Sequence, residues 1–398
     1  MPGYEVMGEE EKKEVLDVFQ TGVLFRYEFG DQRQGVYKVR EFEQAFAALT
    51  GAKDALAVSS GSAALKVALA ALGVSPGDEV LVPGFTFVAT WEAVLDVGAV
   101  PVMVEIDDTL NMDPEDVKTK ITARTKAIIP VHMLGAMAGI EEIMKAAGRT
   151  PVLEDTAQSC GGTYKGRYLG TFGALGTFSF DSVKTVTTGE GGMIITNDTG
   201  LWTRASEYHD HGHDHRPVGR GNEGRNFFGF NYRMMELQGA IGLAQLRKLP
   251  LMLERQRANK KRLKDHLAEI PGLTFRQLPD PEGDTATFLA FFLPDAEKAS
   301  AFNQVLTENK AAAINFYNNT WHYYRCWEHL QQKKTPFKSG WPFKYLEGRT
   351  LDYPPEALPK TAEILSRTLV WPINVKMSED DFKRLFTAAD KAAKAVWG

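Results

Sequence analysis

The sequence predicts an α/β protein in which a mostly parallel β-sheet is flanked by helices and followed by a smaller α+β domain. Short apolar runs alternate with helical patterns between residues 54 and 197, and a long helical stretch of different character begins at residue 236. Alternating strands and helices are typical of parallel sheets that are covered on both faces. The chain has 398 residues, which is enough for two such domains.

Two helices are predicted before the sheet begins. Residues 9–22 and 37–51 carry apolar residues at helical spacing, and each segment ends at a glycine. The first helix would belong to an N-terminal arm of roughly 30 residues.

Seven segments have the apolar pattern of strands, and three helical patterns lie between them. The strands are predicted at 54–60, 78–84, 100–107, 125–133, 151–158, 176–182 and 191–197, and the helices at 61–73, 86–98 and 140–148.

The pattern changes in the last part of the chain. We expect residues 236–272 to be helical but broken near Pro250, because proline has no amide hydrogen. A boundary near this proline gives a large domain at 1–250 and a small domain at 251–398, which ends in an amphipathic helix.

The composition indicates an ordinary globular protein. Charged residues make up 24% and hydrophobic residues 43% of the chain, and the net charge is −5, so neither nucleic acid nor a membrane is an expected partner. The acidic start does not resemble a signal peptide, and no apolar run reaches the roughly 18 residues of a membrane span. The two cysteines form no disulfide framework. We therefore expect a cytoplasmic protein.

The segment SSGSAAL, residues 59–65, joins the first strand to a helix. Gly61 permits a close backbone approach, and Ser62 and Ala63 offer amide hydrogens at the helix N-terminus, where an anion is favoured. An ordinary helix cap would have the same letters. No G-x-G-x-x-G follows this strand, which argues against a dinucleotide enzyme.

Two further candidates follow later strands. Asp155 ends a strand, and Lys184 stands in FSFDSVKTVTTGEGG at 178–192. The simplest interpretation makes Asp155 an ion-pair partner or helix cap and Lys184 a solvated surface residue. Alternatively, Asp155 holds a proton on a pyridine nitrogen, and a semi-buried Lys184 with a lowered pKa forms a Schiff base.

The combination favours the second interpretation. A phosphate cradle, the aromatic Phe87, Asp155 and Lys184 occur in the order expected for a site that binds pyridoxal 5'-phosphate (PLP). Phe87 would stack on the ring, Asp155 would pair with the ring nitrogen, and Lys184 would carry the cofactor.

Five stretches resemble the DegT/DnrJ/EryC1/StrS family of sugar aminotransferases, which have the aspartate aminotransferase fold (fold type I). They are SSGSAAL, GDEVLVPGFTFVAT, EDTAQSCGGTYKGRYLGTFG, FSFDSVKTVTTGEGGMIITND and GFNYRMMELQGAIGLAQL, and they span roughly residues 10–250. The resemblance implies a large domain with a mostly parallel seven-stranded sheet and a smaller C-terminal domain. Some members have a histidine in place of the reactive lysine and dehydrate their substrates; Lys184 therefore favours transamination.

The resemblance also implies how the cofactor is held. Ser62 and Ala63 would give backbone amides to the phosphate, with Gly61 making room. Ser179 would add a hydroxyl to the same phosphate, and Gln158 would lie near the ring oxygen.

An active site shared between two subunits is implied as well. Asn231 would reach the phosphate of the neighbouring subunit, so the expected form is a homodimer.

The implied reaction is a ping-pong transamination with L-glutamate as amino donor. Lys184 would hold the cofactor as an aldimine and then move a proton as general base and acid, with pyridoxamine 5'-phosphate (PMP) as the intermediate form. Asp155 would keep the ring nitrogen protonated.

Other stretches resemble the branch of the family that forms 8-amino-3,8-dideoxy-manno-octulosonate, a sugar acid of lipopolysaccharide. They are FRYEFGDQRQ, HDHGHDH, LAQLRKLP, PDPEGDTATF and NNTWHYYRCWEHL. The implied acceptor is 3,8-dideoxy-8-oxo-manno-octulosonate. The alternatives are a nucleotide-diphosphate-linked keto-sugar, a PLP-dependent dehydratase or decarboxylase, and a non-catalytic PLP-binding regulator.

Substrate contacts are predicted from two histidine-containing segments. Residues 209–215, HDHGHDH, invite a metal interpretation, but the cofactor chemistry needs no metal, and His211 and His215 are candidates for substrate contact. In WHYYRCW, residues 321–327, His322 and Arg325 could bind a sugar and its carboxylate, although a surface helix with a packed aromatic face fits equally well. Cys160 is expected to be a buried small hydrophobe.

Overall fold

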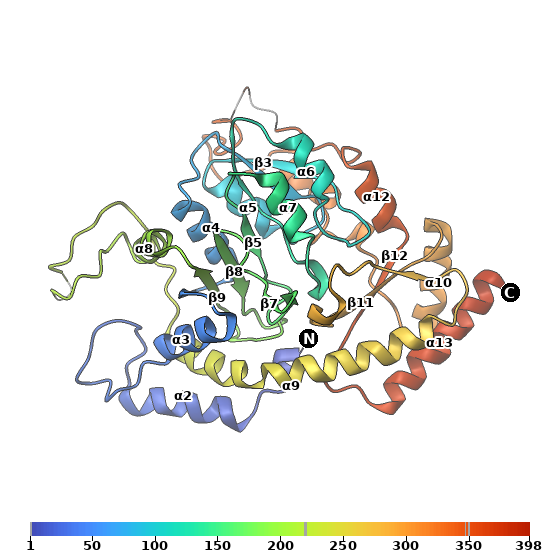
Figure 1. Cartoon of the computed structure of the whole chain (residues 1–398), viewed down its shortest axis with the longest axis horizontal. Helices are drawn as coiled ribbons and strands as arrows, with labels where there is room; N and C mark the ends of the chain where they lie inside the picture. The colour runs from blue at the N-terminus through green and yellow to red at the C-terminus, as the bar shows by residue number, and fades with distance from the viewer. Residues whose placement is uncertain (1, 219–220, 347, 349–350) are drawn as a thin grey trace.

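A computed structural model describes residues 2–218, 221–346, 348 and 351–398. Its centre is a mostly parallel sheet of seven strands, as the sequence predicts (Figure 1). The order across the sheet is β1 (Asp54–Val58), β9 (Gly192–Thr196), β8 (Leu175–Ser179), β5 (Leu153–Asp155), β4 (Thr125–Ile128), β2 (Glu79–Pro83) and β3 (Val100–Val104). Parallel bridges from Ile128 to Val152 and from Val131 to Asp155 join its two halves, and β9 alone among these strands runs antiparallel to its neighbours.

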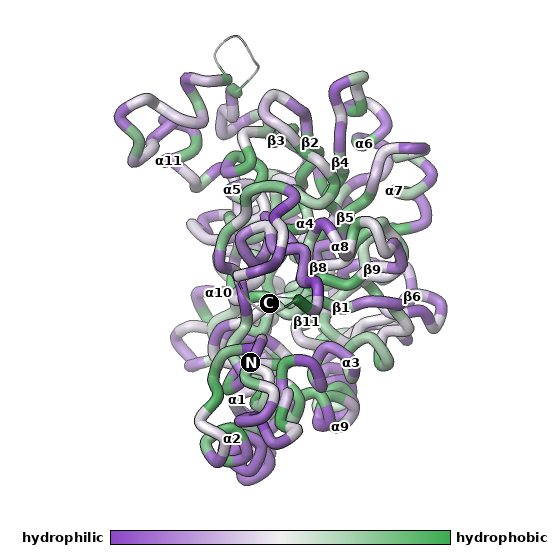
Figure 2. The backbone as a smooth tube through the Cα atoms, turned by 90° about the vertical axis from the view of Figure 1, so that its left-hand side faces the viewer, coloured by the Kyte–Doolittle hydropathy of each residue, from purple (hydrophilic) through white to green (hydrophobic). Residues whose placement is uncertain are grey.

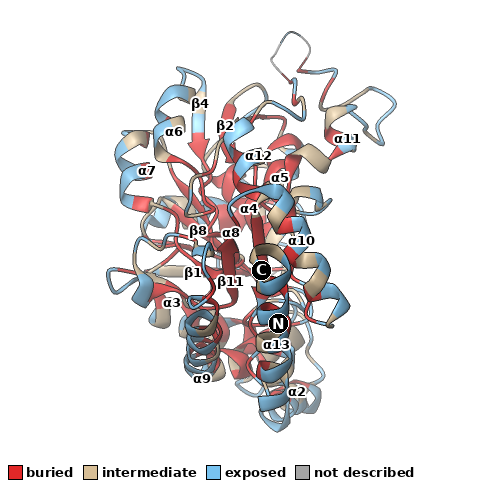
Figure 3. Ribbon diagram, turned by 90° about the vertical axis from the view of Figure 1, so that its right-hand side faces the viewer, coloured by how far each residue is buried: buried red, intermediate tan, exposed pale blue. Residues whose placement is uncertain are grey.

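Helices cover this sheet. They are α4 (Gly61–Ala71), α5 (Ala89–Asp96), α6 (Pro114–Lys120), α7 (Ile140–Ala147) and α8 (Thr199–Tyr208). Every residue of β2, β8 and β9 is buried, because helices and loops exclude water from both faces. The hydrophobic segments accordingly lie inside and the polar ones outside (Figures 2 and 3).

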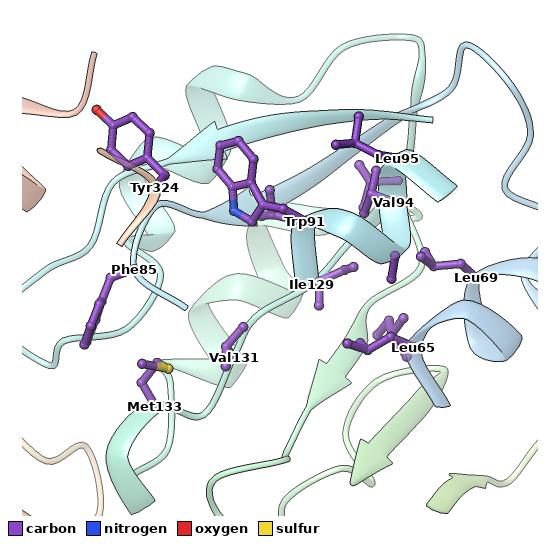
Figure 4. Close-up of a cluster of buried hydrophobic side chains, with 14 of the residues drawn as sticks. Leu65, Leu69, Phe85, Trp91, Val94, Leu95, Ile129, Val131, Met133 and Tyr324 are labelled. Atoms are coloured by element: carbon purple, nitrogen blue, oxygen red, sulfur yellow. The ribbon is translucent and has the colours of Figure 1, made fainter. Parts of the chain in front are cut away.

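The largest core cluster lies between the sheet, α4 and α5. Trp91, completely buried, donates its indole N–H to the carbonyl of Pro83 at 2.9 Å, so its one polar group is satisfied. Its ring packs against that of Tyr324 from the C-terminal part of the chain (Figure 4). The C-terminal part is therefore joined to the large sheet through the core.

The N-terminal helices pack along the long helix α9 (Glu236–Leu267). They are α1 (Pro2–Glu5), α2 (Glu9–Thr21) and α3 (Lys38–Thr50). The predicted glycine stops are found at Gly22 and Gly51, whose φ angles of 69° and 73° are left-handed and therefore suit glycine.

The predicted break near Pro250 is wrong, because α9 runs through this proline without interruption. Proline removes one backbone hydrogen bond from a helix. Leu249 and Met252, on either side of it, are buried, and packing of this kind holds the helix together where propensity disfavours it.

A second core forms near the C-terminus. The antiparallel strands β10 (Thr274–Phe275), β11 (Phe288–Phe292) and β12 (Thr368–Pro372) pack with α10 (Ala296–Glu308), α12 (Pro359–Ser366) and α13 (Glu379–Trp397). This core includes Leu263 of α9, whereas Leu249 of the same helix belongs to a core cluster of the large domain. The predicted boundary at residue 250 therefore falls inside a continuous helix that packs in both cores. The division into 1–250 and 251–398 stays a prediction.

Shorter elements complete the described chain. They are the hairpin β6 (Thr163–Tyr164) and β7 (Arg167–Tyr168), helix α11 (Glu328–Gln331), and the 3-10 turns Met133–Gly135, Pro281–Gly283, Phe316–Asn318 and Tyr324–Cys326. Within the described ranges, none of the helices combines the length and the apolar character that a bilayer span requires.

Candidate active site

A cavity of about 280 Å³ lies at the carboxyl end of the large sheet. The loops after β1, β2, β5 and β8 meet there, as the topology of a parallel sheet leads one to expect. Eight of the residues selected from the sequence line it: Gly61, Ser62, Phe87, Asp155, Gln158, Ser179, Lys184 and His322. Residues that are distant in sequence thus share one site.

One wall of the cavity is the N-terminus of α4. Ser60 caps this helix by accepting the Ala63 amide on its hydroxyl at 3.0 Å, so the amide of Ala63, predicted to bind phosphate, already has a partner here. The first two amides of the helix, from Gly61 and Ser62, have no acceptor among the described residues. These two donors and the helix dipole favour an anion at this wall.

Gly61 is required at this wall by a close approach to β8. A Cβ atom on Gly61 would come within 2.7 Å of Cβ and 2.9 Å of Oγ of Ser179. The Ser179 hydroxyl therefore lies next to the helix N-terminus, where it adds a neutral hydrogen-bonding group to the free amides.

Lys184 is half-buried in the wall formed by the loop between β8 and β9. Loss of hydration lowers the pKa of its amine, and the charges of Asp155 and Asp181 only partly oppose this effect. Its backbone carbonyl accepts the amide of Gly3 at 3.2 Å, so the N-terminal segment holds the loop. The lowered pKa and the place of Lys184 in the cavity wall both argue against a solvated surface lysine and favour an amine that can react.

Asp155 is 4% exposed and lies at the end of β5. Burial raises the pKa of its carboxyl, whereas hydrogen bonds from the amide of Ala157 (3.1 Å) and the hydroxyl of Thr90 (3.0 Å), and the charge of Lys184, lower it. Both oxygens are therefore oriented by donors, and the carboxylate lines the cavity, where it is available to pair with a bound cation.

Behind Asp155 lies a buried histidine that sequence reasoning missed. The amide of Ala138 donates to Nδ1 of His132 at 3.0 Å, so the ring proton must be on Nε2, which donates to Glu154 at 3.0 Å. The backbone amide of His132 donates to the carbonyl of Asp155 at 2.9 Å. This network fixes the strand end that carries Asp155.

A strained turn at Met133–Gly135 forms the wall next to Gln158. Leu134 has a φ of 55°, which is rare for leucine, and its amide donates to Oε1 of Gln158 at 3.0 Å. Arg276, from the C-terminal part of the chain, is buried and donates to the carbonyl of Met133 at 3.0 Å. The side chain of Gln158 is thereby fixed at the cavity edge.

Phe87 lies at the cavity with its ring parallel to that of Trp321, at a centroid distance of 5.8 Å and an interplanar angle of 5°. A cofactor ring stacked on Phe87 would extend this pair of aromatic rings. The segment that carries Trp321 also brings His322 to the cavity, next to Phe87. The stacking role of Phe87 and the sugar-binding role of His322 stay predictions.

Five selected residues do not line this cavity in the single chain, and one of them, Ala63, belongs to the start of α4 described above. Asn231, His211 and His215 lie on the segment between α8 and α9, which extends away from the body (Figure 1). The guanidinium of Arg325 contacts the hydroxyl and ring of Tyr317, so it is not proposed as a carboxylate clamp.

The remaining expectations concern metal and thiols. The part of the chain that the structure describes contains no group of three or more His, Cys, Asp or Glu side chains placed to hold a metal ion. Cys160 is buried, as predicted, and burial raises the pKa of its thiol to about 12; Cys326 is half-buried, and both thiols are free.

The residues missed from sequence were His132, Glu154, Thr90, Gly3, Asn319 and Arg276. Glu154 and Thr90 lie inside recognised motifs, and Asn319 contacts its sequence neighbours Trp321 and His322. The contact of Arg276 with Met133, in contrast, depends on the folding of distant segments. The only available signal was charge or polarity inside apolar runs, as at Glu154 in PVLED.

Comparison with known proteins identifies the family. The model of the DegT/DnrJ/EryC1/StrS aminotransferase family matches residues 6–389. The chain belongs to this family. The family and the class of enzyme predicted from the motifs, an aminotransferase, are therefore confirmed.

Relatives of known name agree with this assignment. The chain is 44% identical over 215 residues to GDP-perosamine synthase of Caulobacter vibrioides and 42% identical over 223 residues to that of Escherichia coli O157:H7. These matches cover 52% and 55% of the chain but only 56% and 60% of the two relatives. Over nearly full length, covering 98% of the chain and 96% of the relative, it is 33% identical to the spore coat polysaccharide biosynthesis protein SpsC of Bacillus subtilis.

Solved structures of this fold superimpose well. An aminotransferase from Psychrobacter cryohalolentis matches with a TM-score of 0.84 and 27% identity, covering 98% of both chains. NtdA of Bacillus subtilis, solved with bound PMP, matches with a TM-score of 0.80 and 25% identity, covering 99% of this chain and 84% of the other. The predicted aspartate aminotransferase-like fold is thus confirmed.

Proposed function

We propose that this protein is a PLP-dependent sugar aminotransferase that takes an amino group from L-glutamate and gives it to a sugar carbonyl. The observation that carries the proposal is the placement of Lys184 and Asp155 in one cavity, each with a pKa shifted by burial. The family assignment and the cofactor of NtdA support the same chemistry.

The residues present suit PLP. Two free amides at the start of α4 and the Ser179 hydroxyl match a phosphate, Phe87 matches a ring face, and Asp155 matches a cationic ring nitrogen. Gln158 would lie at the ring edge, and Ala63 would support the phosphate wall through its cap. When bound, the cofactor supplies an electron sink for the carbon that loses a proton, and PMP is its form between the two half-reactions.

The chain's own groups would then do three things. Lys184 would bind the cofactor through its amine and, once released, move a proton to and from the reacting carbon. Asp155, held by Thr90 and Ala157, would keep a proton on the ring nitrogen. The apolar wall would exclude water from the site.

The sugar itself can be proposed more narrowly. The stretches that resemble the octulosonate branch support 3,8-dideoxy-8-oxo-manno-octulosonate as acceptor, with 8-amino-3,8-dideoxy-manno-octulosonate for lipopolysaccharide as product. The GDP-perosamine synthases among the relatives favour the second candidate, a nucleotide-diphosphate-linked keto-sugar. A dehydratase, a decarboxylase or a non-catalytic PLP-binding protein is less consistent with an intact Lys184 and Asp155.

Absorbance spectroscopy tests the proposal directly. L-glutamate added to the PLP-loaded protein should convert the band of the lysine-bound cofactor into the band of PMP. Because transamination is reversible, each amino sugar can then replace glutamate as donor, and comparing 8-amino-3,8-dideoxy-manno-octulosonate with GDP-perosamine decides between the two sugars. A wild-type protein whose cofactor band ignores glutamate and both amino sugars would contradict the proposal.

We also propose a homodimer in which Asn231 completes the neighbouring site. Asn231 is exposed, and the nearby side chains of Phe228, Phe230 and Met235 are 77%, 54% and 47% exposed, a surface that a second copy would cover. His211 and His215, on the same segment, would contact the substrate of that neighbour.

Mixing two inactive variants tests this arrangement. Lys184→Ala and Asn231→Ala subunits exchanged at equal amounts give about half hybrid dimers, each with one intact shared site, so activity should return to roughly a quarter of wild type. If Asn231 acts within its own subunit, no site in the hybrid is intact and no activity returns.

A further inference from the structure

A segment from the C-terminal part of the chain closes one side of the cavity. Its position is fixed by the loop after β2: the amide of Thr86 donates to the carbonyl of His322 at 2.9 Å, and the amide of Val88 donates to that of Trp321 at 3.0 Å. Phe316 packs edge-on against the ring of His322 at 5.3 Å. The imidazole of His322 is therefore held at the cavity by backbone and by packing.

The hydrogen bonds at Asn319 decide which nitrogen of His322 carries the proton. The amides of Trp321 and His322 donate to Oδ1 of Asn319 at 2.9 and 3.0 Å, so this atom must be the amide oxygen. The same oxygen lies 3.1 Å from Nδ1 of His322, which therefore donates to it. The neutral ring consequently has its lone pair on Nε2.

The environment keeps this ring neutral. Burial, with a smaller contribution from the charge of Lys184, lowers the pKa of His322 to about 4. Nε2 has no hydrogen-bond partner among the residues that the structure describes. At neutral pH it is an unused acceptor at the cavity.

Asp181 offers a second acceptor to the same cavity. Its Oδ1 accepts the hydroxyl of Ser182 and the amide of Val183, both at 3.0 Å, whereas Oδ2 accepts no hydrogen bond from any described residue. Asp181 and Lys184 line the same cavity, and the charge of Asp181 raises the pKa of the Lys184 amine.

We propose that Nε2 of His322 and the free oxygen of Asp181 accept hydrogen bonds from hydroxyl groups of the sugar, and thereby select a polyhydroxylated substrate in the sugar half-reaction. This inference rests on the proposed transamination. Acceptors of this kind discriminate strongly, because a substrate that lacks the hydroxyls leaves them unpaired. The apolar side chains of Ile314 and Phe316 would contact the carbon skeleton.

The two half-reactions separate this role from a structural one, because both use the same Lys184. Wild type and three variants, His322→Leu, His322→Gln and Asp181→Asn, are loaded with PLP and titrated with L-glutamate, with 8-amino-3,8-dideoxy-manno-octulosonate and with GDP-perosamine, following the cofactor band. For the amino sugar that wild type accepts, we expect His322→Leu to raise the half-saturation concentration about 10- to 100-fold. His322→Gln keeps an acceptor near the position of Nε2, so its half-saturation concentration for the amino sugar should lie between those of wild type and His322→Leu. Asp181→Asn should also raise this concentration, although His322 is unchanged.

A fourth variant tests the proton assignment. Asn319→Asp keeps an oxygen for all three donors but adds a negative charge, so it should raise the pKa of His322 and turn Nε2 into a donor as the pH falls. Sugar binding by this variant should weaken at lower pH where wild type is unchanged, an effect that simple loss of packing would not produce.

The outcomes distinguish the inference from the function on which it rests. A wild-type protein that does not respond to glutamate refutes the proposed function. The acceptor role of His322 and Asp181 is refuted if wild type responds to glutamate but the variants do not separate the two donors. In that case the half-saturation concentrations for glutamate and for the amino sugar rise equally, or neither rises. If His322→Leu does not fold, the Asp181→Asn and Asn319→Asp results decide.

Discussion

Glu154 allows the support of the active site to be tested quantitatively, because its carboxylate is completely buried and accepts four hydrogen bonds. Oε1 accepts the amides of Phe172 and Gly173, both at 2.6 Å. Oε2 accepts the amide of Gly170 at 2.8 Å and Nε2–H of His132 at 3.0 Å. Replacing Glu154 with glutamine keeps the volume but turns one acceptor oxygen into a donor NH₂ group.

Neither orientation of the new amide avoids a conflict. Its NH₂ group faces either two backbone amides or one backbone amide and His132, whose ring cannot become an acceptor without losing the bond from Ala138. Two buried donors left unpaired cost about 1–3 kcal/mol each, so the free energy of unfolding should fall by roughly 4 kcal/mol. With an unfolding entropy of about 2.1 cal/mol/K per residue over 398 residues, the melting temperature should fall by roughly 5 °C.

Thermal unfolding of the purified variant measures this change. Glu363→Gln is a matched control, because Glu363 is an exposed partner of Arg367 at 2.7 Å and its loss should change stability by no more than about 0.5 kcal/mol. A Glu154→Gln protein that melts within about 1 °C of wild type would refute the assigned donors and the fixed proton on His132.

Three further predictions concern the cavity and the thiols. Lys184→Ala should abolish turnover and the absorbance band of lysine-bound cofactor while leaving the far-UV circular dichroism unchanged; near wild-type turnover would show that Lys184 is not the reactive amine. The pKa of His322 is about 4 in the folded chain and about 6.5 when unfolded, so the unfolded state binds the proton more readily. The contribution of neutral His322 to the free energy of unfolding is therefore full above pH 6.5 and decreases toward pH 4. Urea unfolding of His322→Gln should depend less on pH in this range than that of wild type, and equal pH dependence would contradict the lowered pKa. At pH 8, a thiol reagent should modify half-buried Cys326 before Cys160, whose pKa is about 12, and the reverse order would contradict the burial of Cys160.

Much of the large domain was predictable because its signals are local. The apolar runs that form strands, the glycines at 22 and 51 that end helices, and the Ser-Gly turn before α4 each act through a few adjacent residues. Pro250 shows the limit of such signals, because the packing of α9 on α2 and α3 outweighs one missing hydrogen bond.

The site was predictable to the extent that it follows from strand ends. Asp155 and Ser179 each end a strand, and Gly61 and Phe87 each follow one, so the topology of a parallel sheet brings them together. The donors that orient them were not predictable, since Thr90 reaches Asp155 from a helix 65 positions away in the sequence.

By itself, the sequence determined the order of strands and helices, the family, and the lysine and aspartate of the candidate site. Only the tertiary structure decided which side chains surround them: it joined His322 and Asn319 to Phe87, placed His132 and Glu154 behind Asp155, and separated Arg325 from the cavity. The physical reason is that burial and hydrogen-bond partners, which set the pKa and proton positions of these groups, come from residues that only folding brings together. Glu154 reaches His132 from 22 positions away, and Thr90 reaches Asp155 from 65 positions away.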